Sequence, residues 1–170
     1  NADAYLRCLV VKELLNLKAA RFELGNFVDF LREGDEVFDI GVASGVFYHM
    51  KNPVELIELL SRRVKSLFVW THYYDAELVE AKEHVRCKFS GSWTASHKGF
   101  EHCLHAYGYG AALSWKGFCG GGRESCNWME KPEMLRAFEY FGFEIVEEKL
   151  EADHVHGPAV WLALTNKKLA

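Results

Sequence analysis

The side chains best suited to chemistry stand in short groups, each directly after a segment that reads as a buried strand. These groups are Asn26 with Phe27, Tyr48 with His49, and His72 with Tyr73. In an open parallel sheet, ligands bind beyond the carboxyl ends of the strands. Histidine titrates near neutral pH, so His49 could act as a general base, and the Tyr48 hydroxyl could position a ligand. Each group also fits the alternative of a hydrogen-bonded core or a strand-end turn.

Hydrophobic periodicity predicts the elements that position these groups. Residues 2–17 carry apolar side chains at helical spacing, which predicts a mostly buried helix. Strands are predicted over 21–24, 36–43 and 67–70. The second of them is nearly continuous in apolar residues, as parallel strands covered on both faces are. Between the last two strands, Asn52 and Pro53 are typical of a helix start, and this helix is predicted to end near Arg63.

The later part of the chain departs from this alternation. Residues 85–95 alternate with period two, which predicts a half-exposed antiparallel strand that returns over 100–107 after a turn. An ordered loop is predicted over 107–126. A helix over 132–141, closed by Gly142, and strands over 143–148 and 159–165 complete the elements.

These elements together predict one α/β domain over residues 1–170. Strands that alternate with helices favour a parallel sheet. The segment 75–130 is long for a connection, and such segments often act as lids. We therefore expect 75–130 to be an antiparallel hairpin insertion above the site.

Two motifs carry a resemblance to a known family. The run 44–50 reads SGVFYHM and is followed by Asn52-Pro53. It resembles the "SGVLYHM…P" signature at the fourth strand end in one branch of class I S-adenosylmethionine-dependent methyltransferases. The run 70–75 resembles the "WTHYYD" after the fifth strand of bacterial members, and 118–122 with 127–129 resemble a later "FCGG…WL" stretch. The resemblance covers essentially the whole chain and implies a Rossmann-like sheet.

This resemblance implies S-adenosyl-L-methionine as the cofactor and assigns roles to residues. The expected cofactor contacts are Asn1, Asn26, Phe27, Ala43, Ser44 and Gly45. Asn26 stands where the family usually has an aspartate that binds the adenine amino group, and 43–45 would line the methionine part. The expected catalytic residues are Tyr48, His49 and His72. The expected acceptor-binding residues are Tyr73, Tyr109, Trp115 and Arg123. The alternative is that the aromatic rings of the insertion, Phe118 included, only pack the hairpin onto the sheet.

The family's Gly-rich loop after the first strand has no counterpart in this sequence. The acidic residue that ends the family's second strand has none either. We therefore expect the first two strands of the family sheet to lie outside it. The remaining sheet would then expose a strand edge and apolar surface, which favours a homodimer through that open edge.

Composition limits the partners. Hydrophobic residues make up 49% and charged residues 26% of the 170 residues, and the formal net charge is −4. This balance is ordinary for a globular domain and argues against a nucleic-acid partner. No apolar run approaches the ~20 residues of a membrane span, so we predict no membrane partner. The cysteines are odd in number and scattered, which favours reduced thiols in a cytoplasmic protein.

Metal binding is the rival chemistry in the later part of the chain. Potential ligands crowd one region, namely His97, His102, Cys103, His105, Cys119 and Cys126. No CxxC or HxxxH spacing occurs among them. His102 and His105 lie three apart and point to opposite faces if their segment is a strand. We therefore predict no metal site.

The expected function is methyl transfer from S-adenosylmethionine to a small-molecule acceptor. Such a displacement needs the acceptor aligned behind the methyl group and water kept out. A related family of tRNA-wobble-uridine modifying enzymes shares a "GVLYH" strand end, so an RNA acceptor is the alternative among enzymes. The alternative from another class is a non-catalytic interaction module with an incomplete cofactor site.

Overall fold

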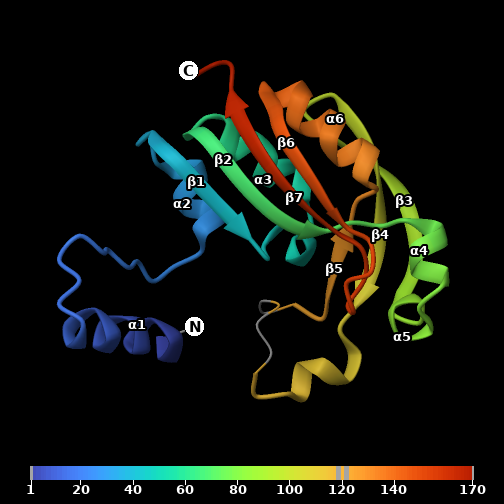
Figure 1. The fold of residues 1–170 in the computed structure, drawn as a ribbon, viewed down its shortest axis with the longest axis horizontal. Coiled ribbons are helices and arrows are strands. Elements are labelled where there is room, and N and C mark those ends of the chain that lie inside the picture. Colours follow the sequence, from blue (N-terminus) through green and yellow to red (C-terminus); the bar gives the residue numbers. More distant parts are fainter. Residues whose placement is uncertain (1, 118–119, 121–122, 170) are drawn as a thin grey trace. The chain divides into compact units, whose positions relative to one another are not determined.

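The chain forms two units, Asn1–Asp35 and Glu36–Ala170. The computed structural model describes residues 2–117, 120 and 123–169, drawn in colour in Figure 1. Within these ranges, every helix is too short or too polar to cross a lipid bilayer.

The N-terminal unit contains two helices, α1 (Ala2–Leu14) and α2 (Phe27–Glu33). Asn26 caps α2, because its side-chain oxygen accepts a hydrogen bond from the Val28 amide at 3.1 Å. Its side-chain amide donates to Asp29 at 2.8 Å. Both ends of the Asn26 side chain are therefore engaged locally, as in a standard N-cap.

One expectation for this unit is wrong and one is confirmed in part. The helix predicted over 2–17 forms over Ala2–Leu14, and the unit by itself buries none of its residues. The described residues of the unit contain no buried side chain, because two short helices do not enclose a core. The strand predicted over 21–24 is irregular backbone, since no described strand pairs with it.

The larger unit contains a four-stranded sheet in the order β1-β2-β7-β6 (Figure 1). Its strands are β1 (Phe38–Ser44), β2 (Val64–His72), β6 (Phe143–Glu151) and β7 (Ala159–Asn166). The pair β1–β2 is parallel, whereas β7 is antiparallel to both of its neighbours. The predicted α/β class is confirmed, and the parallel arrangement holds for the first pair, whose carboxyl ends lie together.

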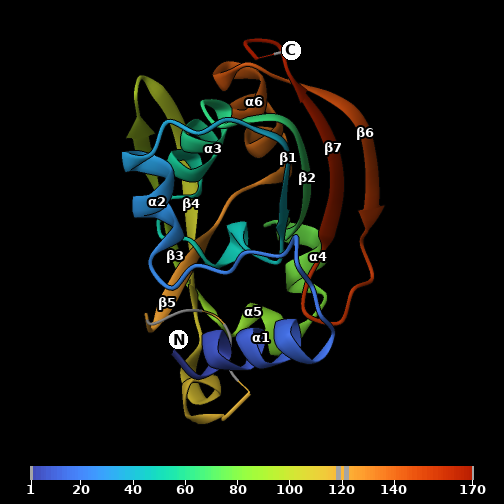
Figure 2. The ribbon, with the colours of Figure 1, turned by 90° about the vertical axis from the view of Figure 1, so that its left-hand side faces the viewer.

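Helices α3 (Pro53–Ser61) and α6 (Lys131–Phe141) pack on the same face of this sheet (Figure 2). The start of α3 and the end of α6 agree with the prediction, whereas α3 ends at Ser61 instead of near Arg63 and α6 begins at Lys131 instead of Pro132. The Asn52 side chain accepts from the Glu55 amide at 3.2 Å, and Gly142 closes α6 with φ of 105°. The core lies between these helices and the sheet, where the buried apolar side chains include Val54, Ile57, Leu67, Val69, Phe138 and Leu162.

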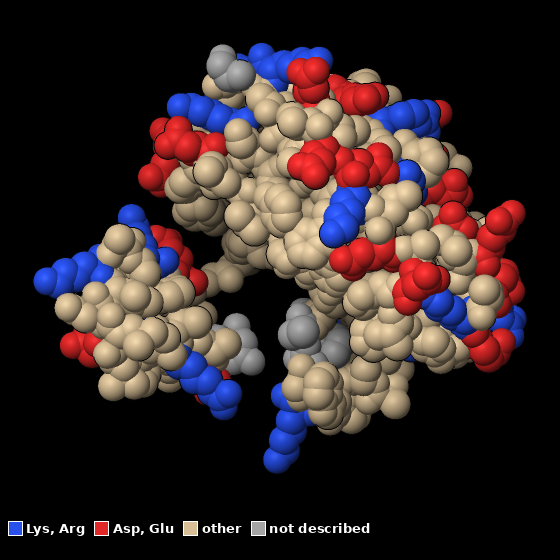
Figure 3. All heavy atoms as spheres, viewed as in Figure 1, with Lys and Arg blue, Asp and Glu red and all other residues tan. Residues whose placement is uncertain are grey.

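The opposite sheet face is apolar and partly exposed. Ile40 and Val42 of β1 are 70% and 68% exposed, and Phe68 of β2 is 37% exposed. Figure 3 shows this face with few charged side chains over β1 and β2. The prediction that β1 is covered on both faces is therefore wrong, because both covering helices lie on one side.

Within residues 75–130, a β-hairpin lies outside α3 on the covered side of the first sheet (Figure 2). A second sheet has the order β3-β4-β5, preceded by short helices and interrupted by a 3₁₀ turn. The bounds are α4 (Ala76–Glu80), α5 (Glu83–Arg86), β3 (Phe89–His97), β4 (Phe100–Gly108), η2 (Gly110–Ser114) and β5 (Ser125–Trp128). The predicted hairpin is confirmed, with Lys98 and Gly99 both at positive φ in its two-residue turn.

Two local predictions in this layer are wrong. The strand expected over 85–95 starts at Phe89, because α5 turns residues 83–86 into a helix that buries Val85. The loop expected over 107–126 ends in β5, which pairs with β4 over a long sequence distance. Such distant pairing leaves no local periodicity.

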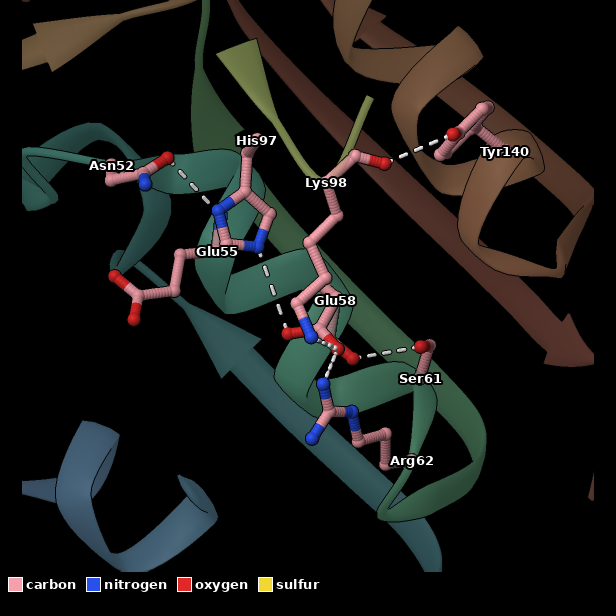
Figure 4. Close-up of polar contacts among 8 residues, drawn as sticks. All are labelled: Asn52, Glu55, Glu58, Ser61, Arg62, His97, Lys98 and Tyr140. Atoms are coloured by element: carbon pink, nitrogen blue, oxygen red, sulfur yellow. Dashed lines mark hydrogen bonds and ion pairs between the residues drawn. The ribbon is translucent and has the colours of Figure 1, made fainter. Parts of the chain in front are cut away.

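A buried carboxylate links the hairpin turn to α3 (Figure 4). The Glu58 side chain is 7% exposed and forms an ion pair with Arg62 of the same helical region. Its oxygens also lie 3.6 Å from Lys98 Nζ and 3.7 Å from His97 Nε2. The Tyr140 hydroxyl donates to the Lys98 carbonyl at 3.1 Å, so α3 and α6 both hold the turn.

We predict that Glu58→Gln destabilises the protein by about 1–2 kcal/mol, because it removes the charge that pairs with Arg62 and Lys98. Denaturant unfolding measures the loss. The matched control is Asp39→Asn, which removes an ion pair with Lys65 in which Asp39 is 87% exposed. That change should cost less than about 1 kcal/mol. An equal effect of both variants would contradict the role of Glu58.

Candidate functional site

The carboxyl ends of β1 and β2 lie side by side and define the candidate site. Ser44 is in register with Trp70, and the Gly45 amide donates to the Trp70 carbonyl at 2.9 Å. Gly45 then turns the chain with φ of 72°, a conformation that favours glycine. The turn leads directly into η1 (Phe47–His49), which carries the Tyr48 and His49 side chains.

Tyr48 lies over the turn that ends β1. A Cβ placed on Gly45 would lie 3.5 Å from the Tyr48 hydroxyl oxygen. Ala43 is buried and Ser44 is exposed at this end of the strand. The structure therefore brings Tyr48 together with residues 43–45, the expected cofactor contacts of the larger unit.

Trp70, His72 and Trp128 form an aromatic cluster that packs beneath Tyr48, and we call this cluster the aromatic floor. Ring centroids lie 4.7 Å apart for Tyr48 and His72, and 6.0 Å apart for Tyr48 and Trp70. His72 in turn stacks on Trp128, with centroids 5.1 Å apart and planes at 4°. The cavity beside these rings encloses about 10 Å³, room for one water at most. The cluster is therefore a packed floor, and a ligand would lie on it rather than within it.

His72 is a neutral ring with a fixed orientation. It is 5% exposed, and its Nδ1 lies 3.0 Å from the Gly157 carbonyl and 3.2 Å from the Pro158 carbonyl. Carbonyl oxygens only accept, so Nδ1 carries the proton. Burial lowers the pKa of His72 to about 4, although the two carbonyls oppose the shift.

His49 is held by a residue from the insertion. Its Nδ1 lies 2.6 Å from the Tyr109 hydroxyl oxygen. Burial lowers the pKa of His49 and raises the pKa of Tyr109 well above its usual range. Both groups are therefore neutral at physiological pH. Tyr109 itself packs in a buried cluster with Tyr107, Cys126 and Trp128.

The other expected site residues are dispersed. Tyr73 is buried, and its pKa is raised first by burial and then by the carboxylates of Asp75 and Glu148. Trp115 is 68% exposed, and Arg123 is exposed. Whether these side chains contact an acceptor stays a prediction.

The expected adenine contacts belong to the N-terminal unit. Asn26 caps α2 and Phe27 is the first residue of that helix, 46% exposed. The local backbone bonding that the sequence left as an alternative for Asn26 is present. Asn1 and Phe118 lie outside the described residues. The cofactor role of Asn26 and Phe27 stays a prediction.

Strand β5 positions the loop that follows η1. The sequence analysis predicted no strand there. The Asn127 amide donates to the Met50 carbonyl at 2.9 Å, and its side chain donates to the Lys51 carbonyl at 2.6 Å. The Lys51 ammonium donates to the Ser125 hydroxyl. These bonds fasten the loop after η1 to the insertion. The resemblance of 127–129 to a family motif pointed to this stretch, but no periodicity marked it as a strand.

The expected absence of a metal site concerns the cysteines and histidines of the insertion. Within residues 2–117, 120 and 123–169, no group of three His, Cys, Asp or Glu side chains is arranged to hold a metal ion. His105 stacks on Tyr74, with ring centroids 3.6 Å apart, and its Nε2 lies 3.3 Å from Oε1 of Glu130. The Cys103 amide bonds the Glu133 carboxylate at 2.7 Å.

Comparison with solved structures identifies the fold. The N-terminal domain of EvdMO1, crystallised in the presence of SAH and D-fucose, matches 98% of this chain with a TM-score of 0.66 and 14% identity. The same domain with SAH bound matches 96% with a TM-score of 0.63 and 15% identity. The fold is that of Rossmann-like class I methyltransferases.

A more distant match agrees with this fold. A protein assigned as an S-adenosylmethionine-dependent methyltransferase from Listeria monocytogenes matches 89% of the chain, with a TM-score of 0.52 and 9% identity, over 73% of its own length. This chain spans 63% and 60% of the two EvdMO1 structures. No protein-family model matches the chain, and no curated protein matches it.

We predict that His72 makes the protein acid-sensitive. Its pKa falls from 6.5 in the unfolded chain to about 4 in the folded one, so the unfolded state binds more protons between these values. Stability is therefore full above pH 6.5 and is lost as the pH falls toward 4, by up to about 3 kcal/mol.

Unfolding free energies at several pH values between 7 and 4.5 test this. His72→Phe keeps a ring against Trp128 but cannot titrate, so its pH dependence should be shallower by about 1.4 kcal/mol per pH unit at most. At pH 8 the His72 ring is neutral in both the folded and the unfolded state. The difference in unfolding free energy between the two proteins at this pH therefore measures the loss of the hydrogen bonds to the carbonyls. An unchanged pH dependence in the variant would show that His72 does not carry the linkage.

Proposed function

We propose that this chain belongs to an S-adenosylmethionine-dependent methyltransferase and transfers a methyl group to a small-molecule acceptor. The observation that supports this most is the end of β1, where an exposed serine and a left-handed glycine stand beside the end of a parallel strand. In sheets of this class, ligands bind beyond such strand ends. The matched EvdMO1 domain was crystallised with SAH, the product of the methyl donor.

The proposed cofactor contacts in the larger unit are Ala43, Ser44 and Gly45. Glycine without a side chain lets a ligand approach the backbone closely, and the Ser44 side chain is exposed. Asn26 and Phe27 are the proposed contacts of the adenine end. The Asn26 side-chain oxygen keeps a second lone pair beside its bond to the Val28 amide, and the Phe27 ring is 46% exposed, so both could contact a purine.

Tyr48 and His49 are the proposed acceptor-side residues. They follow the glycine turn and stand on the aromatic floor that includes His72. Such a floor excludes water from below, which favours a displacement between bound reactants. Tyr73, Trp115 and Arg123 are proposed to contact the acceptor, and the insertion 75–130 is proposed to act as its cover. The proposed compartment is the cytoplasm, where free thiols such as Cys126 stay reduced.

Isothermal titration with S-adenosylmethionine or SAH tests the proposal directly. We expect saturable binding by the purified chain. Gly45→Ala should weaken binding by tenfold or more, because the added Cβ both strains the turn and occupies the approach to the backbone. The matched control is Gly91→Ala, a positive-φ glycine in β3 with no atoms near its Cβ position.

Thermal melting of both variants separates loss of binding from loss of folding. No binding by the folded wild-type chain would contradict a retained cofactor site. Equal affinities of the two glycine variants would remove Gly45 from that site.

A second candidate function is that of an interaction module, in which two copies of the chain pair through β1. It is supported by the difference between β1 and β6, the two edge strands of the four-stranded sheet. The β6 edge carries Glu144, Glu147, Glu148 and Lys149, and charges of this kind discourage association. The β1 edge carries one charged residue, Asp39 at its start, and its Ile40 and Val42 side chains are apolar and exposed. We propose that two copies pair along β1 in solution.

Sedimentation measures this association. Val42→Lys should shift the chain to the monomer, whereas Val146→Lys should not, although Val146 is also 67% exposed in an edge strand. A wild-type chain that is monomeric at high concentration would contradict the proposal.

A further inference from the structure

The contact between His49 and Tyr109 joins the strand-end turn to the insertion. The residues lie 60 positions apart, in η1 and next to η2, and their N···O distance is 2.6 Å. The two rings are tilted at 42°, with centroids 5.7 Å apart. This geometry is that of a short side-chain hydrogen bond rather than of ring stacking.

The hydrogen-bonding inventory decides which atom donates. A neutral imidazole has one protonated nitrogen and one accepting nitrogen, and a phenol has one proton. The Cys126 thiol belongs to the same buried cluster as Tyr109, but sulfur accepts weakly. The Cys126 thiol lies 3.8 Å from the Tyr107 carbonyl and can direct its own proton there. Of these two groups, the imidazole nitrogen is the stronger acceptor for the Tyr109 proton.

The protonation states agree with this direction. Burial keeps the proton on the Tyr109 hydroxyl and keeps His49 neutral. Two neutral partners exclude an ion pair. The imidazole nitrogen accepts more strongly than the Cys126 thiol. This favours the tautomer of His49 in which Nδ1 is the accepting nitrogen.

We propose that Tyr109 donates to Nδ1 of His49 and thereby fixes the proton of His49 on Nε2. In this arrangement Tyr109 is a positioning residue, and His49 presents an N–H group instead of a free basic nitrogen. His49 then acts as a hydrogen-bond donor to the acceptor molecule and not as its general base.

This inference rests on the proposed function only where it concerns the acceptor. A donor at Nε2 selects acceptors that carry an oxygen or nitrogen lone pair next to the reacting atom. It holds that group in line with the methyl donor without removing a proton from it. The neighbouring His72 has the opposite tautomer, because its Nδ1 donates to two carbonyls. Its Nε2 is thus the accepting nitrogen of the aromatic floor.

Nitrogen-15 spectroscopy of the histidine-labelled chain tests the tautomers without cofactor or acceptor. Long-range proton–nitrogen correlations at pH 7 should show His49 protonated on Nε2, with Nδ1 at the shift of an unprotonated nitrogen. In the same spectrum His72 should show the reverse pattern. His49→Gln and His72→Phe assign the signals by their loss.

Tyr109→Phe should release the restraint, so that Nδ1 of His49 leaves the hydrogen-bonded shift and both tautomers become populated. Tyr107→Phe is the matched control, because the Tyr107 hydroxyl lies in the same cluster but bonds Lys88 at 3.1 Å. This control should leave the His49 signals in place. A wild-type His49 protonated on Nδ1, or signals that do not respond to Tyr109→Phe, would overturn the inference. Absent cofactor binding would instead contradict the proposed function and leave the tautomer result unaffected.

Discussion

The hydrogen bonds between β5 and the loop after η1 are the interactions on which the site depends. Asn127 bonds the Met50 carbonyl through its amide and the Lys51 carbonyl through its side chain. These bonds fix a short 3₁₀ turn that has few internal hydrogen bonds of its own. They also bring Trp128 beneath the site and Tyr109 onto His49. The insertion is therefore part of the site's architecture as well as its proposed cover.

Burial then sets the chemistry of the two imidazoles. Low polarity around His49 and His72 disfavours their charged forms, so both serve as neutral hydrogen-bonding groups. Neighbouring groups decide the rest. Backbone carbonyls accept a hydrogen bond from Nδ1 of His72, whereas the Tyr109 hydroxyl is the proposed donor to Nδ1 of His49. The ring centroids of His72 and His49 lie 4.7 Å and 4.1 Å from that of Tyr48. The two histidines nevertheless differ in which ring nitrogen can donate to a ligand and which can accept.

The sheet is stabilised from one side. Helices α3 and α6 and the Glu58 ion pairs tie the β3–β4 hairpin to the covered face. Ile40 and Val42 remain exposed on the other face, in an edge strand whose one charged residue is Asp39 at its start. Apolar edge strands tend to recruit further strands. The same unit therefore combines a candidate site at its strand ends with an exposed apolar surface.

Local sequence signals determined the elements of the larger unit. Apolar runs gave β1 and β2, the Asn52 cap and Pro53 placed the start of α3, and Gly142 placed the end of α6. Lys98-Gly99 gave the hairpin turn, and the run 44–50 indicated the fold and the position of the site. These features depend on residues close in sequence, whose spacing and backbone preferences act before any packing.

The tertiary structure decided which residues far apart in the sequence contact each other and which stay exposed. The pairing of β5 with β4, the exposed face of β1 and the irregular backbone of 21–24 all depend on which neighbours are present. Tyr109 showed no local sign that its hydroxyl would reach His49, 60 positions away. The sequence by itself therefore predicted where a candidate site lies. The tertiary structure decided the hydrogen bonding and burial of the side chains there, because their partners come from remote parts of the chain.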